Sequence, residues 1–357
     1  MIWLVVSCAL GLPAGVILLW RLPLCGDEWC NELSGFSIVV PARNEERNLP
    51  HLMSSIREED LQPLEIIIID DASDDRTAIV AKAWGATVIT ARPLQQGWTG
   101  KTWACHQGAG EVGSDVLMFL DADTYFEPGG LRKVIASYRA AAAVPVAFSV
   151  IPYHVMRKPY EELSLFFNLL MAMGAGGFGL IGKPRLFGQS LVIARDIYER
   201  SGGHSGVRRS ILENLAFSSN VESAGGVCAC RGGRGALNVR MFPDGIGQLC
   251  EGWAKAFADG AAASEPMVLV IATFWLAALC STVFALIFVK GTWHLAFAGL
   301  YAGYVLQLFW LSRQLGNYRI LTSLLYPLPL FFYFGVFGQS LFRRVFKRNV
   351  SWRGRQI

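Results

Sequence analysis

Acidic residues follow three short apolar runs within the first 123 residues of the chain. FSIVVP (36–41) is followed by Arg43, Asn44 and Glu45, EIIII (65–69) by Asp70 and Asp71, and VLMFL (116–120) by Asp121 and Asp123. One or two carboxylates, completed by substrate phosphates and water, are what Mg²⁺ or Mn²⁺ prefers. Further carboxylates suit hydrogen bonds to ribose hydroxyls or a pyrimidine N–H. These residue types indicate a site for a nucleotide and a divalent metal.

The segments around these runs have the spacing of alternating strands and helices. EIIIIDD (65–71) and DVLMFLDAD (115–123) are typical of strands buried on both faces, and TVITA (87–91) of a further strand. Apolar residues at helical spacing predict a helix around 49–56 and another from Ser73 to Trp84. The alternation predicts a doubly wound parallel α/β sheet, which binds its ligands at the carboxyl ends of the strands.

Each acidic pair has a simpler interpretation. A solvated turn or a helix cap also carries such pairs, and Ser73 with Asp74 and Asp75 would suit the first turn of a helix. A D-x-D sequence is weak evidence by itself, and no phosphate loop of the type G-x-x-x-x-G-K-[ST] is present. Three acidic groups in register on one sheet edge nevertheless favour a functional site over three unrelated turns.

The composition argues against several classes of protein. Hydrophobic residues make up 53% of the 357 residues and charged residues only 17%, with a mean hydropathy of +0.36, whereas soluble chains carry about 25% charged residues. A purely soluble or a disordered protein is therefore not expected. The net charge of +4 is concentrated at the C-terminus, without the basic stripe of a nucleic-acid-binding protein. The eight cysteines include no C-x-x-C pair and predict structural thiols.

The N-terminal apolar run predicts a membrane anchor. Residues 2–20 carry no charge and are long enough to cross a bilayer, and they lack the basic start of a signal peptide. Because Arg21 is the first positive residue, the positive-inside rule predicts an outer N-terminus and a cytosolic chain beyond it. We expect an anchor over 1–21, a cytosolic globular domain over 36–260, membrane or interfacial helices over 266–342 and a basic cytosolic tail over 343–357.

The number of C-terminal apolar runs conflicts with a cytosolic location of the tail that follows them. Apolar runs cover 267–289, 294–311 and 320–342, and the tail after them is rich in arginine and lysine. Three full crossings would leave this basic tail outside, whereas the positive-inside rule requires an even number of crossings after residue 260. Pro327 and Pro329 interrupt the third run, so we expect it to form a hairpin or to lie in the interface. The predicted location is the cell membrane, as a multi-pass protein with the bilayer as partner.

Four motifs in order resemble those of an inverting, family 2 glycosyltransferase of the GT-A fold. They are VVPARNEE (39–46), IIDDASDD (68–75), FLDADT (119–124) and ILENLAFS (211–218). The resemblance implies transfer of a hexose, with glucose expected, from a UDP-sugar. It implies that the nucleoside is held by Pro41, Arg43, Glu45 and Asp71, and that Asp121 and Asp123 bind the metal, Mg²⁺ or Mn²⁺, and the sugar nucleotide.

Further stretches resemble bacterial members of the family that act on lipids. They are GWTGKTWAC (97–105), GRGALNVRMFPDG (233–245), QLCEGWAKAFADGA (248–261) and SWRGR (351–355). The implied acceptor is hydrophobic, such as a C30 carotenoid acid, while a polyprenyl phosphate, a diacylglycerol, a ceramide-like lipid or a hopanoid remain alternatives. Lys101 would offset diphosphate charge, although a lone lysine is more often a solvated side chain.

Two departures from the family pattern affect the catalytic base and the acceptor site. Glu213-Asn214 stands where many relatives have Glu-Asp, and Asn cannot accept a proton at neutral pH. Glu213 is then the candidate base, with Asp244 and Glu251 as alternatives, unless an already ionised acceptor needs none. Gln248-x-x-x-x-Trp253 replaces Q-x-x-R-W, which weakens the case for a processive synthase. Trp253 either packs at the membrane interface or contacts the acceptor. Asp244 and Gln248 are expected to bind substrate.

Two other classes of protein explain the sequence less well than a glycosyltransferase. Asn214 is compatible with a non-catalytic protein that carries a degenerate transferase domain, but the donor-site acids are intact. A transporter would carry ionisable residues within its membrane spans, and the apolar runs contain almost none. A glycosyltransferase therefore explains the sequence best.

Overall fold

The computed structural model describes residues 1–27, 33–142, 144–210, 212–263, 265–345, 351–352 and 355–356. The side chains of residues 255–263 and of residues from 343 onward are outside the description. The predicted basic tail over 343–357 lies within this second part. Contacts divide the chain into two compact units. The helical unit consists of Met1–Leu22, Val155–Pro184 and Met241–Val350, and the sheet unit of Pro23–His154, Arg185–Arg240 and Ser351–Ile357.

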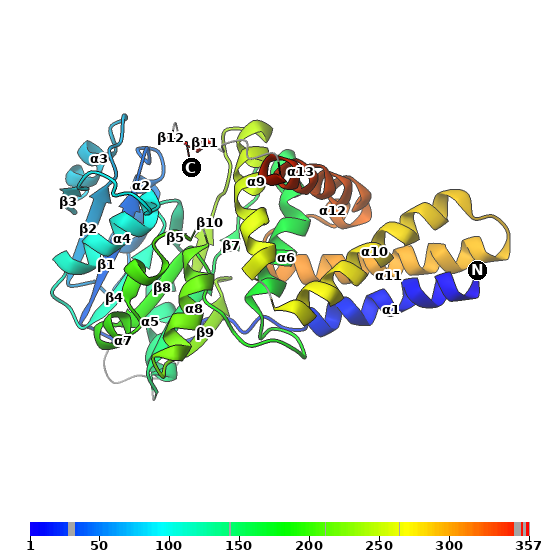
Figure 1. The fold of residues 1–357 in the computed structure, drawn as a ribbon, viewed down its shortest axis with the longest axis horizontal. Coiled ribbons are helices and arrows are strands. Elements are labelled where there is room, and N and C mark those ends of the chain that lie inside the picture. Colours follow the sequence, from blue (N-terminus) through cyan, green and yellow to red (C-terminus); the bar gives the residue numbers. More distant parts are fainter. Residues whose placement is uncertain are drawn as a thin grey trace. The chain divides into compact units, whose positions relative to one another are not determined.

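A seven-stranded sheet organises the sheet unit (Figure 1), with the strand order β3-β2-β1-β4-β8-β6-β9. Its strands are β1 (Phe36–Ala42), β2 (Glu65–Asp70), β3 (Thr87–Thr90), β4 (Val116–Leu120), β6 (Val146–Ile151), β8 (Ser190–Ala194) and β9 (Val227–Gly232). A smaller sheet of order β5-β10-β7 consists of β5 (Thr124–Phe126), β7 (Tyr153–His154) and β10 (Leu237–Val239). A third pair is β11 (Ser351–Trp352) with β12 (Arg355–Gln356).

Helices cover both faces of the large sheet. They are α2 (Leu49–Arg57), α3 (Thr77–Ala83), α4 (Gly100–Glu111), α5 (Gly130–Ala141), α7 (Arg195–Arg200), the 3₁₀ helix η2 (Gly203–Val207) and α8 (Glu213–Ser223). Alternate residues of β1 point to opposite faces: Ile38 packs in the core shared with α2 and α5, and Val39 in the core shared with α4 and α8. Burial on both faces explains the continuous apolar runs that the sequence shows.

The expected parallel sheet is right for six of the seven strands and wrong at β8. Strands β3, β2, β1 and β4 run parallel, and β6 and β9 run in the same direction, whereas β8 is antiparallel to both β4 and β6. A parallel connection needs a crossover, usually a helix. Before β8 the chain passes through residues 155–184, whose helices belong to the helical unit and not to the sheet unit. The α/β sheet is therefore mixed.

The helix expected from Ser73 begins four residues later. Its N-cap is Arg76, and α3 starts at Thr77. Ser73 is used differently, because its hydroxyl accepts a hydrogen bond from the Asn44 backbone at 3.0 Å. Its own N–H donates to Asp70 at 3.2 Å. The expected cap therefore joins the ends of β1 and β2 to each other.

One glycine sets the distance between α4 and the sheet. A Cβ atom on Gly108 would overlap with the side chain of Val39 in β1 and would lie 3.1 Å from Ile69 in β2. Real Cβ atoms rarely come this close to a neighbour, so only glycine allows the observed approach. Because α4 carries Lys101 in its first turn, this contact also fixes the position of that lysine.

The helical unit contains a bundle of three apolar helices, α1 (Ile2–Leu18), α10 (Pro266–Phe288) and α11 (Thr292–Leu315), which lie side by side in Figure 1. The hydroxyl of Tyr304 donates to the Cys8 carbonyl at 2.7 Å, and the Gln307 amide donates to the Leu12 carbonyl at 2.6 Å. The residue numbers increase together, so α1 and α11 run in the same direction. α10 runs against both.

The remaining helices of this unit are η1 (Pro159–Ser164), α6 (Leu165–Ala175), α9 (Ile246–Ala263), α12 (Ile320–Leu324) and α13 (Pro327–Val345). The apolar run over 320–342 is interrupted as its prolines predict, because α12 ends at Leu324 and α13 begins at Pro327. Among the described helices, α10 and α11 are long and apolar enough to cross a bilayer, and α1 and Pro327–Phe342 are shorter apolar helices.

Candidate active site

The ends of three neighbouring strands bring the predicted acidic groups to one edge of the sheet. Ala42 at the end of β1 pairs with Asp70 at the end of β2, and Val39 pairs with Phe119 in β4. All three strands run parallel, so the residues that follow them emerge at the same edge. Glu45, Asp71 and Asp121 therefore lie at the sheet edge where α/β proteins bind ligands.

The first part of this edge is held by contacts between the ends of β1 and β2. The Arg43 guanidinium donates to the carbonyl of Asp71 at 2.8 Å, and the Asp71 N–H donates to the carbonyl of Ala42, also at 2.8 Å. Asn44 and Ala72 adopt positive φ angles of 56° and 51°. This conformation is rare for a residue with a Cβ atom, and it clusters at functional sites. The sequence pattern gave no sign of it at Ala72.

Glu45 and Asp71 are both buried at this end of the site, with exposed fractions of 8% and 7%. The Glu45 carboxylate accepts a hydrogen bond from the Asn48 side chain at 2.7 Å, and its backbone N–H donates to Thr77 at 2.8 Å. Glu45 therefore helps to fix the entry of α2 in addition to any role toward a ligand.

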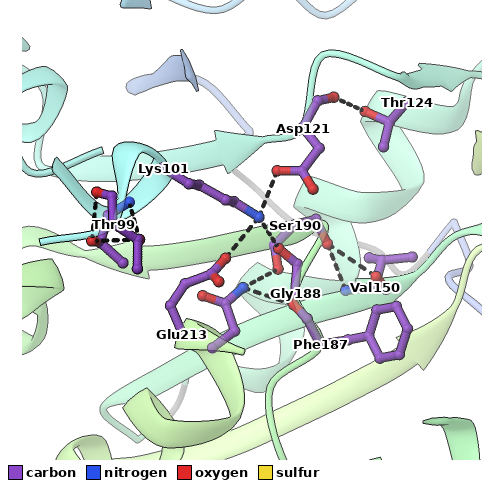
Figure 2. A network of polar contacts seen from close by, with 11 residues as sticks. Thr99, Lys101, Asp121, Thr124, Val150, Phe187, Gly188, Ser190 and Glu213 are labelled. Carbon is purple, nitrogen blue, oxygen red and sulfur yellow. Dashed lines mark hydrogen bonds and ion pairs between the residues drawn. The ribbon is translucent and has the colours of Figure 1, made fainter. Parts of the chain in front are cut away.

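Lys101 connects the second part of the edge (Figure 2). Its ammonium lies 2.7 Å from Oδ1 of Asp121 and 2.7 Å from Oε1 of Glu213, and it donates to the carbonyl of Gly188 at 2.8 Å. The interpretation of Lys101 as a solvated side chain is therefore wrong, because its charge is matched within the protein.

The first turn of α4 places this lysine. The Thr99 hydroxyl caps the helix by accepting from the Thr102 backbone at 3.3 Å, and the Thr102 hydroxyl donates to the carbonyl of Arg208 at 2.9 Å. The Thr99 N–H donates to the same carbonyl at 2.9 Å. The start of α4 is thus attached to the segment that leads into α8.

The electrostatics of this group follow from burial and from the three charges. Burial alone would lower the pKa of an ammonium group, but the carboxylates of Asp121 and Glu213 raise the pKa of Lys101 above its usual value. Burial raises the pKa of Glu213, and Lys101 opposes this effect. Glu213 is only 4% exposed in its side chain, whereas Asp121 is 25% exposed. Asp121 is therefore the more solvent-accessible of the two carboxylates in this conformation.

Asn214 has a defined structural role next to Glu213. Its side-chain amide donates to the carbonyls of Phe187 at 2.7 Å and Ser190 at 3.3 Å. It thereby holds the segment that presents the Gly188 carbonyl to Lys101. Glu213, at the start of α8, instead directs its carboxylate toward Lys101 and Asp121 (Figure 2).

A small cavity lies among these groups. Its walls include Pro41, Lys101, Asp121, His204 and Glu213, and its volume of about 10 Å³ is room for about one water molecule. His204 is a site residue that sequence reasoning missed. Its ring bonds to the Tyr198 hydroxyl at 2.9 Å, and burial lowers its pKa to about 3, which keeps it neutral. No motif surrounds His204 in the sequence, so no signal pointed to it.

The donor set suits a divalent metal that arrives with a phosphate-bearing substrate. Within the described residues, no three His, Cys, Asp or Glu side chains gather into a metal site. Asp121 and Asp123 flank a turn that is closed by hydrogen bonds from Thr124 to the Asp121 carbonyl, at 3.1 Å from its N–H and 2.7 Å from its hydroxyl. A positive group, the Lys101 ammonium, already lies against Asp121. Two carboxylates completed by phosphate oxygens and water fit Mg²⁺ or Mn²⁺.

The remaining predicted site residues belong to the helical unit. The Asp244 N–H donates to the Gln248 side chain at 3.1 Å, and the Gln248 amide donates back to Asp244 at 3.3 Å, so these residues bond to each other at the start of α9. Trp253 is buried, stacks on Phe167 at 4.8 Å and donates to Ser164 at 3.1 Å. Trp253 thus packs inside its unit, and acceptor contact by these three residues stays a prediction.

Comparison with known proteins identifies the class to which this fold and site belong. The family model of Glycosyl transferase family 2 matches residues 37–216, so the chain belongs to this family and is a glycosyltransferase. The expected family and the GT-A type of α/β fold are confirmed. The matched range contains all the acidic groups at the sheet edge.

Individual proteins similar to this chain add detail beyond the family. The chain is 30% identical over 329 residues to the 4,4'-diaponeurosporenoate glycosyltransferase of Staphylococcus aureus (strain USA300), covering 90% of this chain and 87% of the relative. The protein of the same name from strain MRSA252 matches at the same identity and coverage. A solved mannosyltransferase from Pyrobaculum calidifontis, in complex with GDP-Man and Mn²⁺, is similar with a TM-score of 0.53 and 17% identity, covering 86% of this chain and 98% of that one. This last likeness shows the fold.

Proposed function

We propose that this glycosyltransferase moves a hexose, glucose, from a UDP-sugar to a hydrophobic acceptor of the carotenoid-acid type. The observation that carries the proposal is the group formed by Lys101, Asp121 and Glu213 at the carboxyl edge of the sheet. The similarity over 90% of the chain to a diaponeurosporenoate glycosyltransferase supports the acceptor class. The 17% identical mannosyltransferase, by contrast, does not bear on the choice of donor.

The donor is proposed to lie along the sheet edge. Pro41, Arg43, Glu45 and Asp71 would bind the nucleoside at the ends of β1 and β2, while Asp121 and Asp123 would hold the diphosphate end through Mg²⁺ or Mn²⁺. Charge that develops on the leaving diphosphate is stabilised by the divalent ion when one is bound there. Lys101 adds positive charge to the same place from the first turn of α4.

The acceptor is proposed to attack the anomeric carbon in line with the departing diphosphate, which inverts its configuration. Glu213 is the candidate base for a hydroxyl acceptor, because its carboxylate faces Asp121 across Lys101 and Asn214 cannot take a proton. A carboxylic acid acceptor is already ionised at neutral pH and attacks without a base. Asn214 therefore does not require that the protein be inactive.

Membranes that contain the protein, incubated with labelled UDP-glucose and a panel of lipids, test this function. We expect label in 4,4'-diaponeurosporenoate, and none with Asp123→Asn, whose amide is a poor ligand for a divalent ion. Exposed Asp60→Asn is the matched control and should keep full activity. Label only in a polyprenyl phosphate, diacylglycerol, ceramide or hopanoid would overturn the acceptor. Failure to release UDP with any acceptor would support a degenerate, non-catalytic protein.

We also propose that α1, α10 and α11 cross the cell membrane and that the catalytic domain is cytosolic. Exposed tryptophans lie 17 positions apart along both segments: Trp3 in α1 and Trp20 two residues after its end, and Trp293 and Trp310 within α11. In α11 this spacing corresponds to about 25 Å of helix, close to the hydrocarbon thickness of roughly 30 Å, and tryptophan collects at both interfaces. Trp20 and Trp310 are in contact, with ring centroids 5.3 Å apart.

The α12–α13 segment has features of an interfacial segment, which would leave an even number of crossings after residue 260. α13 buries Leu330, Tyr333 and Val336, and its Ser340 hydroxyl donates to the Ala254 carbonyl of α9 at 2.6 Å. It exposes a second apolar set, which consists of Leu328, Phe331, Phe334, Leu341 and Phe342. A helix that packs on protein along one side and is apolar along the other suits the membrane interface. The chain after it would then stay cytosolic.

Labelling of single cysteines with a membrane-impermeant maleimide in intact cells tests this topology. After replacement of the native cysteines, a cysteine at Lys290 should react from outside. Cysteines at Asp60 and at Gln356 should react only after the cells are opened. Labelling of the Gln356 position in intact cells would show that α13 crosses the bilayer.

A further inference from the structure

Three oxygen atoms of the protein surround the ammonium group of Lys101. Its ammonium contacts Asp121 and Glu213, each at 2.7 Å, and the carbonyl of Gly188 at 2.8 Å. An ammonium group has three N–H donors. These three oxygens already surround the ammonium, so a diphosphate that binds to Lys101 has to take the place of at least one of them.

Asp121 is the partner for which a metal would compete. It is the more exposed of the two carboxylates, with 25% of its side chain exposed against 4% for Glu213. A divalent ion at Asp121 would lie beside the Lys101 ammonium. Two positive charges only a few ångströms apart repel strongly where water is partly excluded. The free protein is therefore poorly prepared to accept a metal ion alone.

A nucleoside diphosphate changes this balance. Its phosphate oxygens supply new acceptors for the ammonium and new ligands for the metal at the same time. The small cavity between Lys101, Asp121 and Glu213, of about 10 Å³, also has no room for a sugar while the lysine bridges it. Movement of the Lys101 side chain both frees Asp121 and opens this space.

We propose that Lys101 couples metal binding to donor binding, because its ammonium occupies Asp121 until a nucleoside diphosphate draws it away. Metal and nucleotide then bind together, and neither binds tightly by itself. This inference rests on the proposed function, since it assumes that Asp121 holds the metal of the donor complex. Lys101 acts here as a positioning residue for the metal site as well as a diphosphate ligand.

Binding measurements on the full chain in detergent test the coupling. Electron paramagnetic resonance of free Mn²⁺ measures the affinity of the protein for Mn²⁺ without nucleotide. Calorimetric titration with UDP, with and without Mn²⁺, measures the affinity for UDP. The second measurement is corrected for the complex that Mn²⁺ and UDP form in solution. In the unmodified protein we expect Mn²⁺ to tighten UDP binding by roughly 5- to 150-fold, and UDP to tighten Mn²⁺ binding by the same factor.

Lys101→Gln removes the competing cation. It should bind Mn²⁺ alone more tightly than the unmodified protein, roughly tenfold, and its coupling factor should fall toward one. A lysine with only a structural role would give the opposite result, because its loss would weaken every ligand. Lys82→Gln, at an exposed position of α3, is the matched control and should leave both affinities unchanged.

The outcomes separate this inference from the proposed function. The role of Lys101 is overturned if Lys101→Gln binds Mn²⁺ alone no more tightly than the unmodified protein does. It is also overturned if the two proteins have the same coupling factor. Absence of any Mn²⁺–UDP binding by the unmodified protein overturns the proposed function itself. If melting shows that Lys101→Gln is unfolded, the double variant Lys101→Gln/Glu213→Gln leaves no buried carboxylate unpaired and carries the same expectations.

Discussion

The side-chain amide of Asn214 donates to the carbonyl of Phe187 at 2.7 Å. A second bond from the same amide reaches Ser190 at 3.3 Å, so both ends of the segment that contains Gly188 are fixed from α8. A carboxylate has no hydrogen to donate at neutral pH. The residue that looked like a lost base is thus a donor that supports the site.

Asn214→Asp should weaken the protein without improving catalysis. The new carboxylate would face two carbonyl oxygens in a buried position, and an unsatisfied buried group costs about 1–3 kcal/mol or more when charged. We expect a lower melting temperature and lower turnover, measured by thermal unfolding and by UDP release. Ser219→Asp, which adds a carboxylate at an exposed position of the same helix, should change neither. A rise in turnover for Asn214→Asp would mean that an acid is missing there.

Two glycines in α4 should respond to alanine in opposite ways. Gly108→Ala brings a Cβ atom into Val39 and Ile69, and such overpacking typically costs about 1–3 kcal/mol. Gly110→Ala meets no atom within 4 Å, so it should stabilise the helix by up to about 1 kcal/mol. Chemical unfolding of both variants measures the difference. Equal effects at the two positions would show that α4 does not approach the sheet as closely as described.

The apolar bundle should depend on small residues in α1. A Cβ atom on Gly11 would overlap with Ala278 of α10 and with the Tyr304 hydroxyl of α11, whereas Gly299 of α11 has open space around it. Close approach at small residues is a general means of packing helices in a membrane. Gly11→Leu should therefore lower the melting temperature in detergent, while Gly299→Leu should not. Comparable losses in both variants would contradict the packing.

Two buried histidines in the sheet unit predict an acid-sensitive fold. Burial lowers the pKa of His204 to about 3 and that of His154 to about 4, from 6.5. Between these values and pH 6.5 the unfolded chain binds more protons than the folded one, so stability falls as the pH falls through this window. Each histidine should contribute about 2 kcal/mol of loss between pH 6.5 and pH 5.

Unfolding at several pH values measures this slope. His204→Gln keeps a polar side chain next to Tyr198, and we expect it to remove about half of the pH dependence. His51→Gln changes a histidine at an exposed position of α2 and should leave the slope as it is. The same slope in the His204 variant would show that this ring is protonated or accessible in the folded protein.

The sequence predicted the strands β1, β2, β3 and β4 and the acidic edge of the sheet because these features are local. An apolar run such as 116–120 forms a strand wherever it is buried on both faces, and Asp121 must then follow that strand. The direction of β8 is different, because no pattern within Ser190–Ala194 encodes its orientation. That direction depends on the path of the chain through residues 155–184.

The contacts of Lys101 were beyond prediction for the same reason. The carbonyl of Gly188 lies 87 positions away in the sequence, and only the folded chain brings it to the lysine. The sequence allowed either a solvated lysine or a diphosphate ligand at this position. In the structure, Lys101 instead forms ion pairs with both Asp121 and Glu213. This arrangement depends on the packing of α4 and α8 at the same sheet edge, which the sequence pattern does not encode.

The anchored first turn of α4 determines how quickly the site can rearrange. Since Thr99 and Thr102 tie the backbone to Arg208, Lys101 changes partners by rotation about its own side-chain bonds alone. Rotations of exposed side chains take picoseconds to nanoseconds, whereas a typical enzyme turnover takes roughly 0.1 s. Exchange of the ammonium between carboxylate and phosphate would thus fit within one turnover, even if its two ion pairs slow it by several orders of magnitude.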